Sequence, residues 1–216
     1  MSTYPAAVVF DCDGTLVDTE PLCDASWHEV LGPMGHEVTP TDLAAVLGRP
    51  WAHVYAYWAD RFDVPASDEL RGLVRESFVR LFDERVRLFD DAVEVARALR
   101  RAGVALAVCT SSSRRHLDRV FALGVGDLFD ASVAAEDTAR HKPDPDPYLE
   151  AARRLGVHAS VCIAIEDSPV GVAAAVAAGM RTVAVVRNGA DPVELSQAAV
   201  VVERLTLDVL DGRTEA

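Results

Sequence analysis

Long hydrophobic runs, closely spaced cysteines and an excess of positive charge are all absent from this sequence of 216 residues. Its apolar runs are far too short to cross a bilayer, and no basic segment followed by an apolar stretch opens the chain. We therefore expect neither a membrane span nor a signal peptide. The formal net charge of −13 disfavours nucleic acid and anionic membranes as partners, and the acidic surface is compatible with a monomer.

The four cysteines form neither a CxxC pair nor a spacing typical of metal sites. Three of the four lie in or beside apolar runs, which is typical of buried free thiols. Free thiols indicate a reducing compartment, so we expect a cytoplasmic protein.

Short apolar runs alternate with helical patterns after residue 90, which is typical of a parallel sheet covered by helices on both faces. The predicted strands lie at residues 6–10, 104–109, 129–135, 161–165, 182–186 and 199–202. Residues from about 18 to 88 look wholly helical, with three apolar stripes that contain all the tryptophans. The sequence therefore predicts an α/β core with a helical insertion after its first strand.

The first predicted strand ends in two carboxylates. Asp11 and Asp13 follow the apolar run directly, and Gly14 frees the backbone to turn away. Carboxylates at the end of a buried strand cost desolvation free energy unless a cation or hydrogen bonds compensate them. The alternative interpretation is an acidic turn that only caps the next helix.

Polar residues also follow two later strands. Thr110 ends one strand, Glu166 and Asp167 end another, and Lys142 lies in a proline-rich loop between them. Because neighbouring parallel strands end in one crevice, we expect these side chains to meet there. For each group taken alone a plainer interpretation stays open: Thr110 as a helix cap, Glu166 and Asp167 at a helix start, and Lys142 on the surface.

This set of side chains suits metal-assisted phosphoryl transfer. Asp11 and Asp167 offer the hard oxygen ligands that Mg²⁺ prefers, and Asp11 can attack phosphorus to form an aspartyl phosphate. Asp13 can act as general acid and then as general base. Thr110 and the backbone N–H groups after it can hold phosphate oxygens, and Lys142 supplies the positive charge that an acidic protein needs for an anionic substrate.

In their order along the chain, these residues resemble the motifs of the haloacid dehalogenase (HAD) superfamily, over nearly the whole sequence. The matching segments are Asp11-x-Asp13-Gly14-Thr15, the strand-ending Thr110, Lys142 in His-Lys-Pro-Asp-Pro, and Glu166-Asp167-Ser168-Pro169-x-Gly171. The segment from Leu16 to Leu22 resembles the subgroup that holds β-phosphoglucomutase and the sugar-phosphate phosphatases.

The resemblance implies a Rossmann-like catalytic core of residues 1–16 and 89–216, with an all-helical C1-type cap, residues 17–88, inserted after the first strand. We expect the cap to select the substrate, because the core motifs contact only the phosphoryl group and the metal.

The resemblance also implies a role for each matching residue. Asp11 would be the nucleophile and a Mg²⁺ ligand, and Asp13 the acid/base with its backbone carbonyl on the metal. Asp167 would be the third protein ligand, with Glu166 either a ligand or a support for the ligands. Thr110, Ser111 and Lys142 would bind the transferring phosphoryl group.

Among the reactions of this family, hydrolysis of a small phosphorylated metabolite fits the sequence best. Phosphonate hydrolysis in related enzymes needs a cap lysine, and residues 17–88 contain none. In β-phosphoglucomutases a histidine stands twelve positions after the nucleophile, where this chain has Cys23. We therefore predict a phosphatase for small phosphomonoesters such as sugar phosphates, with a phosphomutase as the alternative. A non-catalytic phosphate-binding protein is the alternative of another class.

Overall fold

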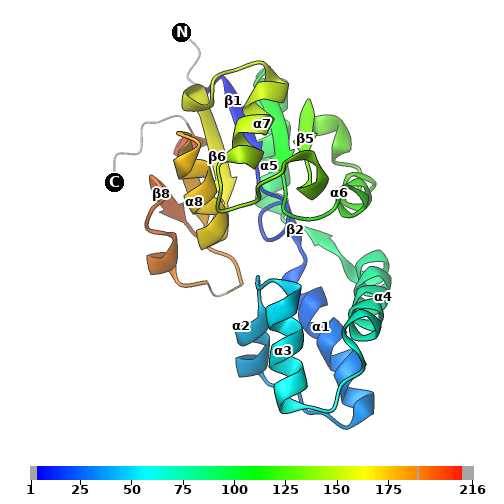
Figure 1. The fold of residues 1–216 in the computed structure, drawn as a ribbon. Helices are drawn as coiled ribbons and strands as arrows, with labels where there is room; N and C mark the ends of the chain where they lie inside the picture. The colour runs from blue at the N-terminus through cyan, green and yellow to red at the C-terminus, as the bar shows by residue number, and fades with distance from the viewer. Residues whose placement is uncertain (1–3, 189, 211–216) are drawn as a thin grey trace. The chain divides into compact units, whose positions relative to one another are not determined.

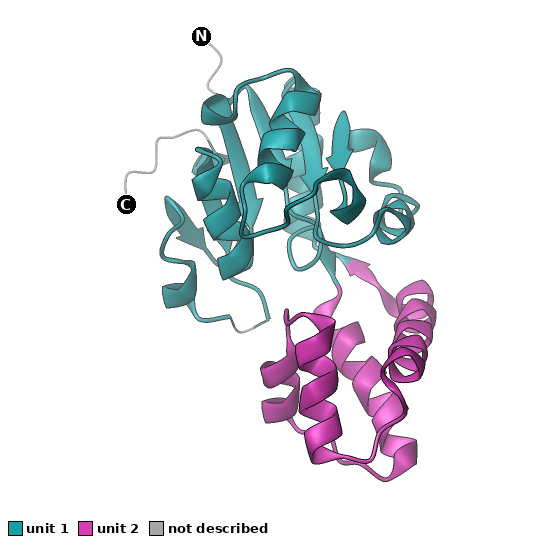
Figure 2. Cartoon of the chain, in the orientation of Figure 1, with its two compact units in different colours: residues 1–18, 88–216 teal, residues 19–87 magenta. Residues whose placement is uncertain are grey.

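The computed structural model describes residues 4–188 and 190–210. The chain divides into two compact units, Met1–Asp18 with Leu88–Ala216 and Thr19–Arg87, which are coloured teal and magenta in Figure 2. Within the described residues no helix has the length and hydropathy needed to span a membrane. We predicted a catalytic core of residues 1–16 and 89–216 and a cap of residues 17–88. The catalytic and cap roles of these parts stay predictions.

The larger unit contains a six-stranded parallel sheet with the order β5-β4-β1-β6-β7-β8 (Figure 1). Its strands are β1 (Ala7–Phe10), β4 (Ala105–Cys109), β5 (Ala131–Val133), β6 (Cys162–Glu166), β7 (Arg181–Val185) and β8 (Val200–Val202). Near its centre, Phe10 of β1 lies in register with Val108 of β4 and Ile165 of β6. The residues that end or follow these three strands therefore meet at one edge of the sheet.

Successive strand residues point to opposite faces of the sheet, and both sets are apolar, which explains why the sheet is buried on both faces. Ala7 and Val9 belong to one core cluster with side chains of α7 and α8. Val8 and Phe10 point the opposite way and are equally buried. The helices of this unit are α5 (Asp90–Arg101), α6 (Arg114–Phe121), α7 (Asp146–Leu155) and α8 (Pro169–Ala177). Short 3₁₀ turns lie at Gly126–Leu128, Ala135–Asp137, Ala159–Val161, Pro192–Leu195 and Leu207–Leu210.

The smaller unit is helical and has its own core. It contains α1 (Glu20–Leu31), a 3₁₀ turn (Gly32–Met34), α2 (Pro40–Val46), α3 (Trp51–Arg61) and α4 (Ser67–Arg85). Trp27 and Trp58 pack at the centre of its core with ring centroids 5.1 Å apart. The three predicted apolar stripes thus lie on α1, α3 and α4.

Three details differ from the sequence-based expectation. Helix α2 was not predicted, although Thr39 and Asp42 form a capping box around it. The stretch from 18 to 88 is not wholly helical, because the short strands β2 (Val17–Asp18) and β3 (Arg87–Leu88) pair at its ends. The pair Asp90-Asp91 is typical of a helix cap in the sequence, but helix α5 begins at Asp90 with Phe89 as its N-cap, so neither aspartate occupies the cap position. The predicted class, a Rossmann-like parallel sheet core with an inserted helical unit, is confirmed.

A buried ion pair fixes the start of α5. The carboxylate of Asp91 accepts hydrogen bonds from the backbone N–H groups of Ala92 and Leu205, both at 2.9 Å, and from Arg187 at 2.7 Å. The Arg187 guanidinium lies 4.1 Å from the ring centroid of Phe89. Burial raises the pKa of the Asp91 carboxyl, but Arg187 and the N–H of Leu205 outweigh it and hold this pKa below its ordinary value.

We expect Asp91→Ala to lower the free energy of unfolding by about 3–5 kcal/mol, because it leaves the buried Arg187 charge uncompensated. Urea unfolding followed by far-ultraviolet circular dichroism measures this loss. All three tryptophans lie in the smaller unit, so their fluorescence reports that unit separately. The control is Glu94→Ala on the same helix, whose side chain is 70% exposed. Equal losses of unfolding free energy in Asp91→Ala and Glu94→Ala would show that the ion pair of Asp91 with Arg187 does not stabilise the fold.

Candidate active site

The turn after β1 depends on glycine at position 14. Gly14 has φ +88°, and the N–H groups of Leu16 and Val17 both donate to the carbonyl of Cys12, at 2.8 and 3.0 Å. A Cβ at Gly14 would lie 2.0 Å from Oδ2 of Asp167. Both the left-handed backbone and the neighbouring carboxylate therefore require glycine here.

Lys142, the only lysine of the sequence, joins three strand ends. Its Nζ donates to Oδ1 of Asp11 at 2.5 Å, to the carbonyl of Cys109 at 3.1 Å and to Oε1 of Glu166 at 2.7 Å. Its side chain is 4% exposed, so the surface-lysine alternative is wrong. The predicted meeting of these strand ends in one place is what the structure shows.

Glu166 is completely buried and holds Lys142 in place. Its Oε1 also accepts from the hydroxyl of Tyr148 at 2.6 Å, and its Oε2 accepts from the N–H and hydroxyl of Ser168. A Cβ at Gly171 would lie 1.8 Å from Oε1 of Glu166. Because Gly171 has no side chain, it leaves room for the Glu166 carboxylate.

The cluster carries more negative than positive charge. Carboxylate oxygens of Asp11, Glu166 and Asp167 lie within 4.8 Å of one another. Burial raises the pKa of Asp11 well above its ordinary value, and the charges of Glu166 and Asp167 raise it further against the opposing effect of Lys142. Burial lowers the pKa of Lys142, but Asp11 and Glu166 reverse this and hold it well above its ordinary value. In their ionised forms these three carboxylates outnumber the Lys142 ammonium, and a divalent cation would stabilise those ionised forms.

Asp13 belongs to a separate network. Its Oδ1 is 2.7 Å from Nε2 of His116, and its Oδ2 accepts from the hydroxyls of Ser112 at 2.8 Å and Thr110 at 3.2 Å. Burial raises the pKa of the Asp13 carboxyl, but these hydrogen bonds outweigh it and hold the pKa below its ordinary value. The two aspartates of the first motif thus have opposite electrostatic environments.

The remaining predicted residues lie around this network. Thr110 is buried directly after β4, and its hydroxyl accepts from the N–H of Ser112 at 2.9 Å. The N-cap of α6 is Ser113, so the helix-cap alternative for Thr110 is wrong. Ser111 follows Thr110 and is exposed. The fourth motif does stand at a helix start, because Ser168 is the N-cap of α8. Glu166 and Asp167 nevertheless belong to the carboxylate cluster.

Three contributors were not predicted as site residues: Ser112, His116 and Tyr148. Ser112 and His116 contact Asp13, and Tyr148 contacts Glu166. The sequence carried a signal for His116, since it lies in the first turn of the helix after Thr110. The sequence indicated Tyr148 only as an apolar position of its helix, and its ring does lie in the core.

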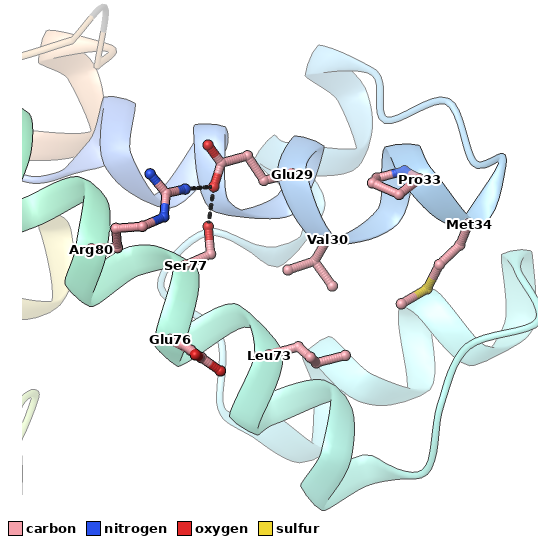
Figure 3. A pocket seen from close by; sticks show the side chains of 8 residues that line it. All are labelled: Glu29, Val30, Pro33, Met34, Leu73, Glu76, Ser77 and Arg80. Carbon is pink, nitrogen blue, oxygen red and sulfur yellow. Dashed lines mark hydrogen bonds and ion pairs between the residues drawn. The ribbon is translucent and has the colours of Figure 1, made fainter.

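A pocket of about 460 Å³ lies within the smaller unit between α1 and α4 (Figure 3). Its lining residues are Glu29, Val30, Pro33, Met34, Leu73, Glu76, Ser77 and Arg80. Glu29 accepts hydrogen bonds from Ser77 and Arg80, so these polar groups compensate one another. None of the predicted site residues lines this pocket.

The family model for haloacid dehalogenase-like hydrolases matches residues 5–179. Hexitol phosphatase B of Escherichia coli K12 is 31% identical over 183 residues, covering 83% of this chain and 82% of that protein. Fructose-1-phosphate phosphatase YqaB of the same organism is 35% identical over 188 residues, covering 82% and 95%. The crystal structure of a HAD family hydrolase from Deinococcus radiodurans R1, with bound phosphate and sodium, has a TM-score of 0.80 and 31% identity, covering 93% and 92%. The chain belongs to the haloacid dehalogenase-like hydrolases.

These findings confirm the predicted superfamily, and the two relatives fit the predicted sugar-phosphatase-like subgroup. They also confirm the prediction of an enzyme, a HAD-type phosphoric monoester hydrolase. The roles of the individual residues are a separate question.

We expect Tyr148→Phe to lower the free energy of unfolding by about 1.5–3 kcal/mol, because the buried Glu166 carboxylate loses a donor while the ring that packs near Lys142 is kept. Chemical unfolding followed by circular dichroism tests this. Tyr55→Phe in the smaller unit is the matched control and is expected to change stability by less than about 0.5 kcal/mol. A Tyr148→Phe variant as stable as the control would show that the hydroxyl contributes nothing.

Proposed function

We propose that this enzyme is a Mg²⁺-dependent phosphatase that hydrolyses small phosphomonoesters of the sugar-phosphate class through an aspartyl phosphate on Asp11. The observation that carries the proposal is the meeting of Asp11, Asp167, Thr110 and Lys142 at the ends of three adjacent parallel strands. A nucleophile, metal ligands, a phosphate-binding hydroxyl and a fixed positive charge then surround one place.

Hydrolysis takes two steps in this proposal. A carboxylate oxygen of Asp11 attacks phosphorus and the ester P–O bond breaks, while Asp13 gives its proton to the leaving alcohol oxygen. Water then attacks the phosphorus of the aspartyl phosphate, and Asp13 takes the proton of that water. The P–O bond to Asp11 breaks, which releases inorganic phosphate and restores both carboxyl groups to their starting states.

The donor set fits a hard divalent cation, because carboxylate oxygens of Asp11, Glu166 and Asp167 lie within 4.8 Å of one another. Asp11, Asp167 and the backbone carbonyl of Asp13 would hold the ion. When bound, Mg²⁺ would supply positive charge that offsets the repulsion between the Asp11 carboxylate and an anionic phosphate. Glu166 serves to hold Lys142, since both of its oxygens already accept hydrogen bonds.

Phosphate binding falls to the loop after β4 and to Lys142. Thr110 and the N–H of Ser111 would contact the oxygens of the transferring group, and Lys142 would neutralise part of its charge. The buried position of Lys142 fixes this charge, so it needs no rearrangement when the substrate arrives.

Sugar phosphates are the proposed substrate class because the relatives are named for hexitol phosphate and fructose 1-phosphate hydrolysis. Position 23 favours hydrolysis over phosphomutase chemistry. It carries a half-buried cysteine on α1, where the resemblance gives the mutases a histidine. A mutase must protect its aspartyl phosphate from water, and a cysteine lacks the imidazole that takes part in this control.

We expect the wild type, with Mg²⁺, to release phosphate from one or more members of a panel of sugar phosphates, nucleotides and small phosphomonoesters. Asp11→Asn is expected to lose at least about 10³-fold in kcat, because an amide is not a nucleophile at phosphorus. A colorimetric assay for free phosphate measures both. The matched control is Asp127→Asn, an exposed aspartate of the same unit, with activity expected to be unchanged.

Two results would contradict this proposal in different ways. If hexose 1-phosphate gave more isomer than free phosphate, the enzyme would be a mutase. If phosphate release survived in Asp11→Asn, the nucleophile would be another group.

Addition of Mg²⁺ should raise the melting temperature more at about pH 8 than at about pH 5.5. The raised pKa of Asp11 means that, between its unfolded and folded pKa values, the folded protein binds more protons than the unfolded chain, so stability falls as pH rises. A cation that binds the ionised carboxylates removes this penalty where it is largest. Differential scanning fluorimetry measures the shift.

Asp167→Asn removes one proposed ligand and should abolish most of the Mg²⁺-dependent shift at both pH values. A shift of the same size in this variant, or one that does not depend on pH, would place the ion elsewhere.

A further inference from the structure

The imidazole of His116 is held against the carboxylate of Asp13. His116 lies in the first turn of α6, and its backbone N–H is 3.3 Å from the capping hydroxyl of Ser113. Its side chain is 13% exposed, and its Nε2 is 2.7 Å from Oδ1 of Asp13. A carboxylate oxygen accepts only, so Nε2 carries the hydrogen of this contact.

The two oxygens of Asp13 face different partners. Oδ1 contacts the imidazole, while Oδ2 contacts the hydroxyls of Thr110 and Ser112. Thr110 is a proposed phosphate ligand, so Oδ2 is the oxygen on the phosphoryl side. His116 therefore holds the far oxygen of Asp13 and leaves the near oxygen directed toward the reacting group.

Substrate binding increases the need for this contact. The Thr110 hydroxyl has one hydrogen, which it donates to Oδ2 of Asp13 in this structure. If a phosphate oxygen accepts this hydrogen, Asp13 loses its hydrogen bond from Thr110. Of the three contacts described above, those from Ser112 and His116 then remain.

We propose that His116 is a positioning residue for the acid/base Asp13, a role that rests on the proposed phosphatase function. Nε2–H of His116 donates to Oδ1 of Asp13 in both protonation states of the carboxyl group. Oδ2 therefore gives its proton to the leaving alcohol oxygen in the first step and takes one from water in the second. His116 keeps its own proton throughout, so the step balances without it.

The test compares leaving groups. An alkoxide from a sugar phosphate leaves only if it is protonated, whereas p-nitrophenolate is stable as an anion and leaves without an acid. The value of kcat/KM reports the steps through departure of the leaving group. We expect His116→Ala to lose about 100-fold in kcat/KM for a sugar phosphate that the wild type hydrolyses, and less than about tenfold for p-nitrophenyl phosphate.

His116→Gln keeps an N–H donor at about the same reach, so it should recover most of the loss with the sugar phosphate. Asp118→Ala, an exposed position on the same helix, is the control and should match the wild type with both substrates. Equal losses with the two substrates, no loss, or no recovery in His116→Gln would each overturn the proposal.

Crystal structures of the wild type and both His116 variants test the contact without any turnover. The Asp13 carboxylate should keep its position in His116→Gln and move in His116→Ala, and an unmoved carboxylate in His116→Ala would overturn the inference. A wild type that hydrolyses neither substrate would instead count against the proposed function, which separates the two failures.

Discussion

The buried ammonium of Lys142 is the interaction on which the rest of this site depends. Its contacts with Asp11, with the Cys109 carbonyl and with Glu166 join the carboxyl ends of β1, β4 and β6. Burying a lysine is costly unless its charge is compensated, and these acceptors compensate it. The sheet order makes this possible, because β1 lies between the other two strands. Glycine at position 171 then leaves room for the Glu166 carboxylate that faces the ammonium.

The same arrangement separates the two aspartates of the first motif. Asp11 lies among carboxylates with a surplus of negative charge, which raises its pKa, whereas Asp13 is surrounded by donors, which lower the pKa of its carboxyl. The proposed roles need the opposite protonation states, and the bound partners would supply them. A divalent cation would stabilise the ionised form of Asp11 that attacks phosphorus, and an anionic phosphoryl group would raise the pKa of the nearby Asp13 carboxyl toward the proton-donating form. Residues two apart in an extended strand point to the same side, so the spacing alone does not separate these carboxyl groups. The turn after β1 and the loop after β4 do so, because Ser112 of that loop and His116 of the helix after it contact Asp13.

Sequence patterns predicted the parts of the site that depend on strand ends. Short buried strands have a plain signature, so the sequence alone placed Asp11, Thr110 and Glu166 at one edge of a parallel sheet. His116 could be placed near the loop after Thr110, but its contact with Asp13 could not be predicted, and neither could the contact of Tyr148 with Glu166. Such contacts depend on helix direction and loop geometry, which apolar periodicity does not encode. Helix α2 was missed for another reason: it spans only Pro40–Val46 and has two buried residues, too few for a stripe.

The division into two units offers a physical basis for variety of substrates. All the residues proposed to handle the phosphoryl group lie in the larger unit, where motif spacing and glycine requirements leave little freedom. The smaller unit has its own core around Trp27 and Trp58, so changes on its surface need not disturb that site. Two relatives of this chain, over nearly the same aligned length, are named as a hexitol phosphatase and as a fructose-1-phosphate phosphatase. Residues that distinguish one phosphate ester from another are therefore to be sought outside the phosphoryl-handling cluster, among positions that neither packing nor chemistry fixes.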